Sequence, residues 1–241
     1  MLSESKDYIG ENCSQRFQMD IIVETIPVSY QDLKNYVYLV FDKETGDGII
    51  IDAAFDSDKI KGTVSRSNVS IRAVLVTHHH PDHTDLAGSL SLHYQVPVII
   101  SKKSFEKAVI ADFFSLILID REVQMMTGSL QINPVLTPGH TAGCTCYIIG
   151  DCLFSGDAVF IEGCGACLDD DSDPEILFHS IRRLKNLISP DTRIYPGHAY
   201  RHDPGKSFSF LLRKNIYFHI NLTDFVSLRM KPVGNNLLNF L

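Results

Sequence analysis

The feature that most constrains this chain is residues 77–83, with the sequence THHHPDH. They directly follow the apolar run of residues 73–76, which predicts a buried strand. The spacing H-x-H-x-D-H offers four side chains that bind metals: His78, His80, Asp82 and His83. Side chains so close together in one loop cannot all face one point. We therefore expect two adjacent metal centres at the end of this strand.

Three later segments place further ligand-type side chains after apolar runs. TPGHT contains His140, FSGDAVF contains Asp157, and YPGHAY contains His198. Imidazole and carboxylate together suit zinc, and three protein ligands per ion leave a position open for water, as catalytic sites require. We expect two zinc ions, with iron or manganese as alternatives.

These motifs, in this order between about residues 21 and 198, resemble those of the metallo-β-lactamase-fold hydrolases. The resemblance implies an α/β protein with an αββα four-layer sandwich, in which two mixed β-sheets are flanked by helices. It implies that one metal is bound by His78, His80 and His140. A second would be bound by Asp82, His83 and His198, with Asp157 bridging the two. Asp82 would also orient the metal-bound hydroxide, so we predict a catalytic role for it.

The pattern of apolar residues and turns is consistent with this architecture. It predicts strands over residues 21–28, 36–41, 48–52, 72–77, 96–100, 130–137, 144–149, 152–155 and 193–195. It predicts helices over residues 56–67 and 85–95, and a third from the N-cap Asp173 to about Ile188. We attribute the acidic run Asp169 to Asp171, like Asp173, to the N-terminus of that helix, which favours negative charge.

Length and composition fit one soluble domain spanning all 241 residues. Residues 1–18 form a polar arm in this prediction, and residues 205–241 a helical or irregular extension. No apolar run approaches the roughly 18 residues of a membrane span, and the first residues do not resemble a secretion signal. With six cysteines, we therefore predict reduced thiols and a cytoplasmic protein. Neither a redox nor a structural-metal role is expected for the C-x-x-C pair Cys164 and Cys167.

The stretch FSGDAVFIEGCG is similar to that of the glyoxalase II thioesterases and the persulfide dioxygenases, which act on glutathione conjugates. In glyoxalase II a basic residue and a tyrosine follow Gly-Cys-Gly, whereas here Ala166, Cys167 and Leu168 do. The family's C-terminal lysine would fall near Leu212, where Arg213 and Lys214 could replace it. These differences argue against a glutathione conjugate as the substrate.

A narrower resemblance is to the zinc-dependent hydrolases associated with trans-acyltransferase polyketide synthases. It rests on Gly-Cys-Gly without a basic follower, on YPGHAYRHDPG and on the tail FLLRKNIYFHINLTDFVSLRM. It implies a thioester hydrolase that removes acyl groups from the phosphopantetheine arms of acyl carrier proteins. The alternatives are a glutathione-thioester hydrolase, or a persulfide dioxygenase with one iron at His78, His80 and Asp157. By position alone, Phe160, Leu168 and Tyr217 are candidates for the acyl pocket.

Charge is unevenly distributed along the chain. Residues 181–241 contain ten Lys or Arg and three Asp or Glu. Residues 1–180 contain 12 Lys or Arg and 26 Asp or Glu. Carrier proteins are acidic, so a basic segment would favour docking. The candidates are Arg182, Arg183, Lys185, Arg201, Lys206, Arg213, Lys214, Arg229 and Lys231. The net charge of −7 argues against nucleic acid as a partner.

Overall fold

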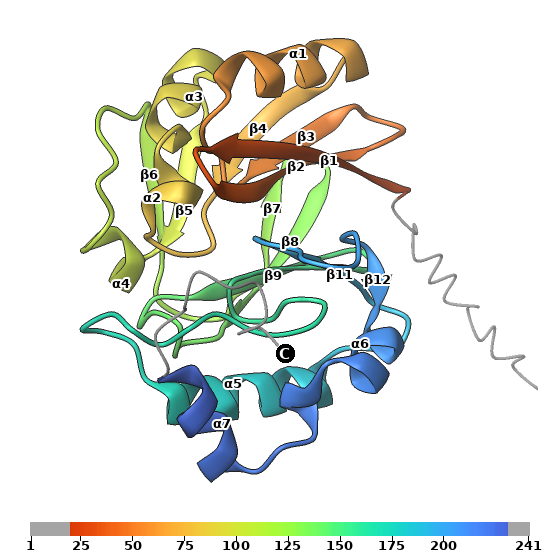
Figure 1. The fold of residues 1–241 in the computed structure, drawn as a ribbon. Coiled ribbons are helices and arrows are strands. Elements are labelled where there is room, and N and C mark those ends of the chain that lie inside the picture. Colours follow the sequence, from red (N-terminus) through yellow and green to blue (C-terminus); the bar gives the residue numbers. More distant parts are fainter. Residues whose placement is uncertain (1–19, 231–241) are drawn as a thin grey trace, which may run out of the picture.

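Two β-sheets pack face to face and carry helices on their outer sides (Figure 1). The computed structural model describes residues 20–230. Each sheet has six strands. This is the predicted αββα sandwich. Among the described residues, no helix is both long and apolar enough to cross a membrane.

The first sheet is built from the first half of the chain, in sequence order. Its strands are β1 (Ile21–Tyr30), β2 (Leu33–Asp42), β3 (Asp47–Ile51), β4 (Ser70–Leu75), β5 (Pro97–Ser101) and β6 (Ser115–Ile119). The first three strands pair antiparallel, and β3 to β6 pair parallel. The carboxyl ends of β3, β4 and β5 therefore meet at one edge of the sheet.

Helices connect the parallel strands of this sheet. They are α1 (Ser57–Ser67), α2 (Pro81–Thr84), α3 (Ala87–Tyr94) and α4 (Lys102–Phe105). Asp56 caps α1 by accepting a hydrogen bond from the Lys59 backbone N–H, and Asn68 ends the helix in the left-handed conformation. The short helix α2 begins at Pro81, a residue suited to the first helical position because it lacks an N–H.

The second sheet comes from the second half of the chain. Its strands are β7 (Met125–Thr127), β8 (Leu130–Leu136), β9 (Thr145–Ile149), β10 (Cys152–Gly156), β11 (Arg193–Pro196) and β12 (Lys206–Ser207). Only β10 and β11 pair parallel, through the crossover helix α5 (Pro174–Leu187). Beyond β12 the chain forms α6 (Phe208–Lys214), the 3₁₀ helix η1 (Ile216–Phe218) and α7 (Leu222–Arg229).

The core has three apolar layers. The middle layer lies between the two sheets and includes Tyr38, Ile51, Tyr147 and Phe154, all with at most 1% of their surface exposed. One outer layer packs the first sheet against α1 and α3, and the other packs the second sheet against α5 to α7. Burial on both faces explains the apolar runs of residues 49–51, 73–75 and 152–154 in β3, β4 and β10.

Hydrogen bonds between the sheets lie next to the strand ends that carry the predicted ligands. Tyr147 donates to the carbonyl of Val76 (2.8 Å), and the Thr145 N–H donates to Thr77 O (2.9 Å). Tyr38 donates to Pro196 O (2.5 Å). The two sheets are therefore held in register where the polar loops meet.

The predicted strands and helices are all present, with ends that differ by a few residues. The strands β6, β7 and β12 and the short helices α2 and α4 were not predicted. The polar arm proposed for residues 1–18 lies outside the described residues, as does the end of the proposed extension. The described part of that extension is mainly helical.

Candidate metal centre

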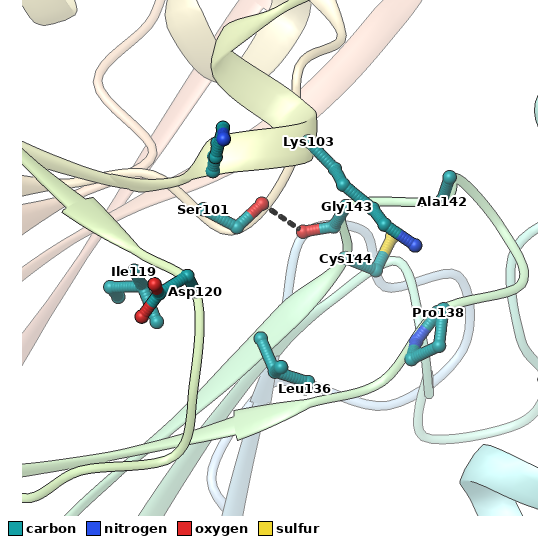
Figure 2. Close-up of a pocket in the computed structure, with 10 residues that line it drawn as sticks. Ser101, Lys103, Ile119, Asp120, Leu136, Pro138, Ala142, Gly143 and Cys144 are labelled. Carbon is teal, nitrogen blue, oxygen red and sulfur yellow. Dashed lines mark hydrogen bonds between the residues drawn. The ribbon is translucent and has the colours of Figure 1, made fainter.

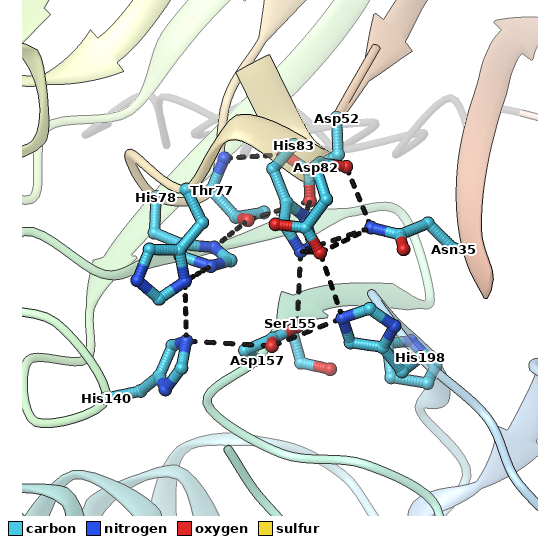
Figure 3. A network of polar contacts seen from close by, with 12 residues as sticks. Asn35, Asp52, Thr77, His78, Asp82, His83, His140, Ser155, Asp157 and His198 are labelled. Carbon is cyan, nitrogen blue, oxygen red and sulfur yellow. Dashed lines mark hydrogen bonds and ion pairs between the residues drawn. The ribbon is translucent and has the colours of Figure 1, made fainter. Parts of the chain in front are cut away.

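Four loops bring all seven predicted ligand side chains into one cluster (Figure 3). The segment after β4 supplies four of them, and the β8–β9 loop supplies His140. Asp157 follows β10, and His198 follows β11. Since β10 and β11 are parallel neighbours, their carboxyl ends place these two residues side by side. Their role as metal ligands remains a prediction.

The first group within the cluster consists of His78, His80 and His140. Their ligand nitrogens all lie within 4.8 Å of one another. His80 Nδ1 is 3.0 Å from His78 Nε2 and 3.2 Å from His140 Nε2. Burial lowers the pKa of His78 and of His140 and so favours the neutral imidazoles that metals bind.

The second group consists of Asp82, His83 and His198. Asp82 Oδ2 lies 3.5 Å from His83 Nε2 and 3.4 Å from His198 Nε2. Asp157 lies between the groups: Oδ1 is 3.5 Å from His83 Nε2, and Oδ2 is 3.6 Å from His140 Nε2 and 3.5 Å from His198 Nε2. This is the placement that a bridging carboxylate needs.

Charge in the second group is strongly coupled. Burial disfavours a charged Asp82, but the hydrogen bond from His198 and the nearby His83 outweigh it and hold the pKa of that carboxyl well below its ordinary value. Burial likewise disfavours a charged His198, yet the adjacent Asp157 raises the pKa of His198 well above its ordinary value. Burial also disfavours a charged His83, but Asp52 and Asp157 raise its pKa, so without a metal both imidazoles help to neutralise the carboxylates.

Backbone carbonyls and a carboxylate fix the orientation of several imidazoles. His140 Nδ1 donates to Ala166 O (2.6 Å), and His198 Nδ1 donates to Lys34 O (2.7 Å). His83 Nδ1 is 2.9 Å from Asp52 Oδ2. Because each outer nitrogen has a partner, the Nε2 atom of each ring faces the cluster. Such partners orient ligands in metal sites.

Two residues of this surrounding shell were not predicted from the sequence. Asp52 follows β3 and also accepts hydrogen bonds from Thr77 N (2.8 Å) and Thr77 Oγ1 (2.7 Å). Asn35 on β2 donates to Asp82 O (2.7 Å) and Oδ2 (3.0 Å). The signal for Asp52 was its position at the end of a strand parallel to β4. Asn35 has no comparable signal, because it lies within a strand.

Two glycines allow the loops to approach the cluster closely. A Cβ at Gly197 would lie 2.5 Å from both His83 Cε1 and Asp157 Oδ1, and one at Gly165 would lie 2.6 Å from His140 Nδ1. Asp157 Oδ1 is buried and has no hydrogen-bond partner. The chemistry of the donor set, five imidazoles and two carboxylates around this buried oxygen, fits a site for zinc-like ions.

The acidic run has a different role from the one predicted. Only Asp173 caps α5, accepting from Glu175 N (2.8 Å) and Ile176 N (3.0 Å). Asp169 Oδ2 instead lies 2.8 Å from His80 Nε2, and Asp170 pairs with Lys107 at 2.6 Å. The N-cap interpretation is therefore wrong for these two residues, because the loop turns them toward the first half of the chain before the helix begins.

The thiols and the acyl-pocket candidates lie largely in the core. Cys164 and Cys167 are free, and burial raises the pKa of each to about 12, as expected for unreactive thiols. Phe160 is 2% exposed, and its ring centre is 5.8 Å from that of His198. Tyr217 instead accepts a hydrogen bond from Arg229, and Leu168 is 53% exposed. Only Phe160 thus lies directly against the cluster.

Three of the proposed docking cations are engaged within the fold. Arg229 is 3% exposed and donates to Cys164 O (2.6 Å). Arg182 donates to Ile220 O (2.8 Å), and Arg183 pairs with Glu122. Lys231 lies outside the described residues. Of the others, Lys185, Arg201, Arg213 and Lys214 are exposed and Lys206 is half-buried.

A pocket of about 200 Å³ borders the loop that carries His140 (Figure 2). Pro138, Ala142 and Gly143 form one wall, and Ser101 donates a hydrogen bond to Gly143 O (2.6 Å). None of the seven cluster residues lines it. This pocket is therefore separate from the candidate metal centre.

Comparison with known proteins is decisive about the family. The model of the metallo-beta-lactamase superfamily matches residues 31–198 and so spans all seven cluster residues. The chain belongs to the metallo-beta-lactamase superfamily. Within this superfamily it is 36% identical over 224 residues to "Probable polyketide biosynthesis zinc-dependent hydrolase PksB" of Bacillus subtilis, covering 90% of this chain and 97% of that protein.

Two further proteins are similar to this chain. The human "Hydroxyacylglutathione hydrolase-like protein" is 34% identical over 186 residues, which cover 74% of this chain and 59% of that protein. The crystal structure of ETHE1 from Myxococcus xanthus superposes with a TM-score of 0.75 at 24% identity, covering 86% of this chain and 89% of that one. This second likeness shows a shared fold.

Proposed function

We propose that this chain is a zinc-dependent thioester hydrolase that removes acyl groups from the phosphopantetheine arms of acyl carrier proteins in polyketide biosynthesis. The observation that carries the proposal is the meeting of seven His and Asp side chains as two groups of three around Asp157. The similarity to PksB over nearly the whole of both chains supports the polyketide setting.

His78, His80 and His140 would hold one ion, Asp82, His83 and His198 the other, with Asp157 between them. Bound there, zinc would polarise the thioester carbonyl and lower the pKa of a water molecule toward about 7. Two groups with three side chains each leave room for water and substrate, unlike a closed structural site.

Asp82 is suited to orient the attacking water. Its pKa is held low, so the carboxylate is charged at neutral pH and can accept a hydrogen bond from that water. Asn35 donates to Asp82 Oδ2 (3.0 Å) and to the Asp82 carbonyl (2.7 Å). These two bonds hold the carboxylate in place for this role.

A thioester suits this site because its leaving group needs little assistance. Water adds to the carbonyl carbon, the C–S bond breaks, and the products are a carboxylic acid and a thiol. An ordinary thiol has a pKa of about 8.5, so the sulfur can leave as a thiolate. No separate general acid is required, in contrast to amide hydrolysis.

Arg213 and Lys214 are the proposed docking residues for the acidic carrier protein. Both are exposed at the end of α6. The next residue, Asn215, is buried and donates to Phe160 O (3.1 Å) and Gly163 O (2.9 Å). Phe160 packs against His198, so the residue that follows the two cations is connected to the cluster through one side chain. Charge complementarity of this kind raises association rates.

A glutathione thioester is the second candidate substrate, favoured by the similarity to the hydroxyacylglutathione hydrolase-like protein. The segment after Gly165 argues against it, because Ala166 and Cys167 bring no cation there. A one-iron dioxygenase would leave the group of Asp82, His83 and His198 without a function. The five cysteines in the described part of the chain are free and buried, which fits a reducing compartment, and we propose a cytoplasmic location.

Mass spectrometry of an acetylated carrier protein tests the proposal. The purified chain should remove the acetyl mass from the phosphopantetheine arm and should lose this activity when treated with a chelator. An acyl-glutathione, assayed in parallel, should be cleaved more slowly. Faster cleavage of the glutathione ester would assign the chain to the second candidate, and inactivity on both would contradict thioester hydrolysis.

A further inference from the structure

The loop after Gly165 contacts two of the three imidazoles in the first group. The Ala166 carbonyl accepts from His140 Nδ1 at 2.6 Å, and Asp169 Oδ2 lies 2.8 Å from His80 Nε2. A carbonyl or carboxylate oxygen can only accept here, so both nitrogens carry the proton. The Nε2–H of His80 thus points at Asp169, and its Nδ1 faces the other two histidines of the group.

Neighbouring contacts hold Asp169 in this position. Ser172 donates to the Asp169 carbonyl through its hydroxyl (2.8 Å) and its N–H (3.2 Å). On the next residue, Asp170 pairs with Lys107 (2.6 Å), and Asp171 accepts from Ala142 N (3.1 Å). Among the described residues, Asp169 is therefore the carboxylate in this run that reaches a cluster histidine.

We propose that Asp169 is a positioning residue for the metal centre, acting through His80. This inference rests on one part of the proposed function, namely that His78, His80 and His140 bind a metal. His80 is the cluster histidine whose side chain is most exposed, at 23%, so packing constrains it less than the buried His78 and His140. A carboxylate on the outer nitrogen supplies the missing constraint. Losing such a partner costs about 10- to 100-fold in metal affinity.

The test is zinc affinity of the full chain, measured by competition with a chromophoric chelator. Asp169→Ala should weaken binding of one zinc ion about 10- to 100-fold. Asp169→Asn should weaken it less, because the amide oxygen still accepts a hydrogen bond. Asp170→Ala is the matched control: it removes the same charge one residue away, with no contact to His80, and should leave the affinity unchanged.

A second readout separates positioning from general damage to the fold. In proton NMR spectra of the metal-free chain, the His80 Nε2–H signal should be visible and should disappear in Asp169→Ala. Thermal unfolding of the metal-free chain should change little, because an exposed ion pair contributes about 0–1 kcal/mol.

Two results would overturn the inference: unchanged zinc affinity in Asp169→Ala, or an equal loss in Asp170→Ala. The latter would assign the effect to the charge of the run. Because no substrate is involved, a chain that binds zinc in this Asp169-dependent way but cleaves no thioester would contradict the proposed function alone.

Discussion

Single residues at the cluster have opposing electrostatic requirements with and without a metal. In the metal-free chain His198 is a cation between Asp82 and Asp157, and its pKa is raised because of them. A histidine that binds a metal must instead be neutral. The same side chain therefore stabilises the metal-free site when it is protonated and the metal-bound site when it is neutral.

This difference predicts proton release when zinc binds at pH 7. His198 has a folded pKa above its ordinary value of 6.5, so its stabilisation is present below that value and is lost as pH rises through the raised pKa. At pH 7 it carries a proton that zinc must displace. Calorimetry in buffers of different ionisation enthalpy should detect this proton. The His198→Ala variant should release fewer protons on binding zinc. If the unmodified chain released no proton, this would contradict the assignment.

The ligand assignment predicts that Asp82→Ala and His140→Ala each abolish turnover. Either change removes one of three protein groups from an open site, whereas the apolar layers are untouched. The free energy of unfolding of the metal-free chain should therefore change by no more than about 1–3 kcal/mol. Steady-state kinetics and chemical denaturation measure both effects. His93→Ala, an exposed position on α3, is the control, and full activity in either cluster variant would exclude the two-metal scheme.

At the scale of elements, strand ends determine where the chemistry is. Parallel pairing of β3 with β4 places Asp52 next to Thr77, and parallel pairing of β10 with β11 places Asp157 next to His198. At some positions these loops approach closely because a glycine has no side chain there. Gly197 is such a position.

Gly197→Ala should weaken zinc binding and reduce turnover at least about tenfold, because its Cβ would lie 2.5 Å from His83 Cε1 and from Asp157 Oδ1. Gly62→Ala in α1 is the matched control. A Cβ there meets only Arg66 Nη1 at 3.4 Å, so alanine should stabilise the helix by about 0.5–1 kcal/mol. Zinc competition and thermal unfolding measure the two effects, and wild-type zinc affinity in Gly197→Ala would contradict the close packing.

At the scale of the whole molecule, charge follows the order of the chain. Within the described residues, the acidic part up to residue 180 forms the first sheet, β7 to β10 and most of the cluster. The basic part from residue 181 forms the second half of α5, β11, β12, α6 and α7. Several of its cations are used internally, so only the exposed ones can attract an acidic partner. The helix α6, which ends in Arg213 and Lys214, lies far from α4, which begins with Lys102 and Lys103 (Figure 1).

Reversing both charges, with Arg213→Glu and Lys214→Glu together, should raise KM for an acyl carrier protein about tenfold or more and leave a small thioester unaffected. The reason is that a carrier protein needs long-range attraction, which a small substrate does not. Lys102→Glu with Lys103→Glu is a control of equal charge change and should alter neither KM. If the α6 double substitution raised KM equally for both substrates, Arg213 and Lys214 would have a role in the fold and not in docking.

The sequence alone determined the ligand types, their spacing and the alternation of strands and helices. Those features are local: H-x-H-x-D-H follows one apolar run, and each later ligand follows another. Periodicity likewise located β4 and α5 to within a few residues. The family resemblance supplied the pairing of His140 with His78 and His80, and the structure brings these three side chains together.

The tertiary structure decided which polar residues surround the cluster. Asn35, Asp52 and Asp169 are 47, 31 and 89 residues from the side chains they contact, and no periodic pattern encodes such pairs. It also decided that Arg229 is buried, although its charge suggested docking. Sequence spacing reports neighbours within an element, whereas contacts between loops arise only when two sheets pack together.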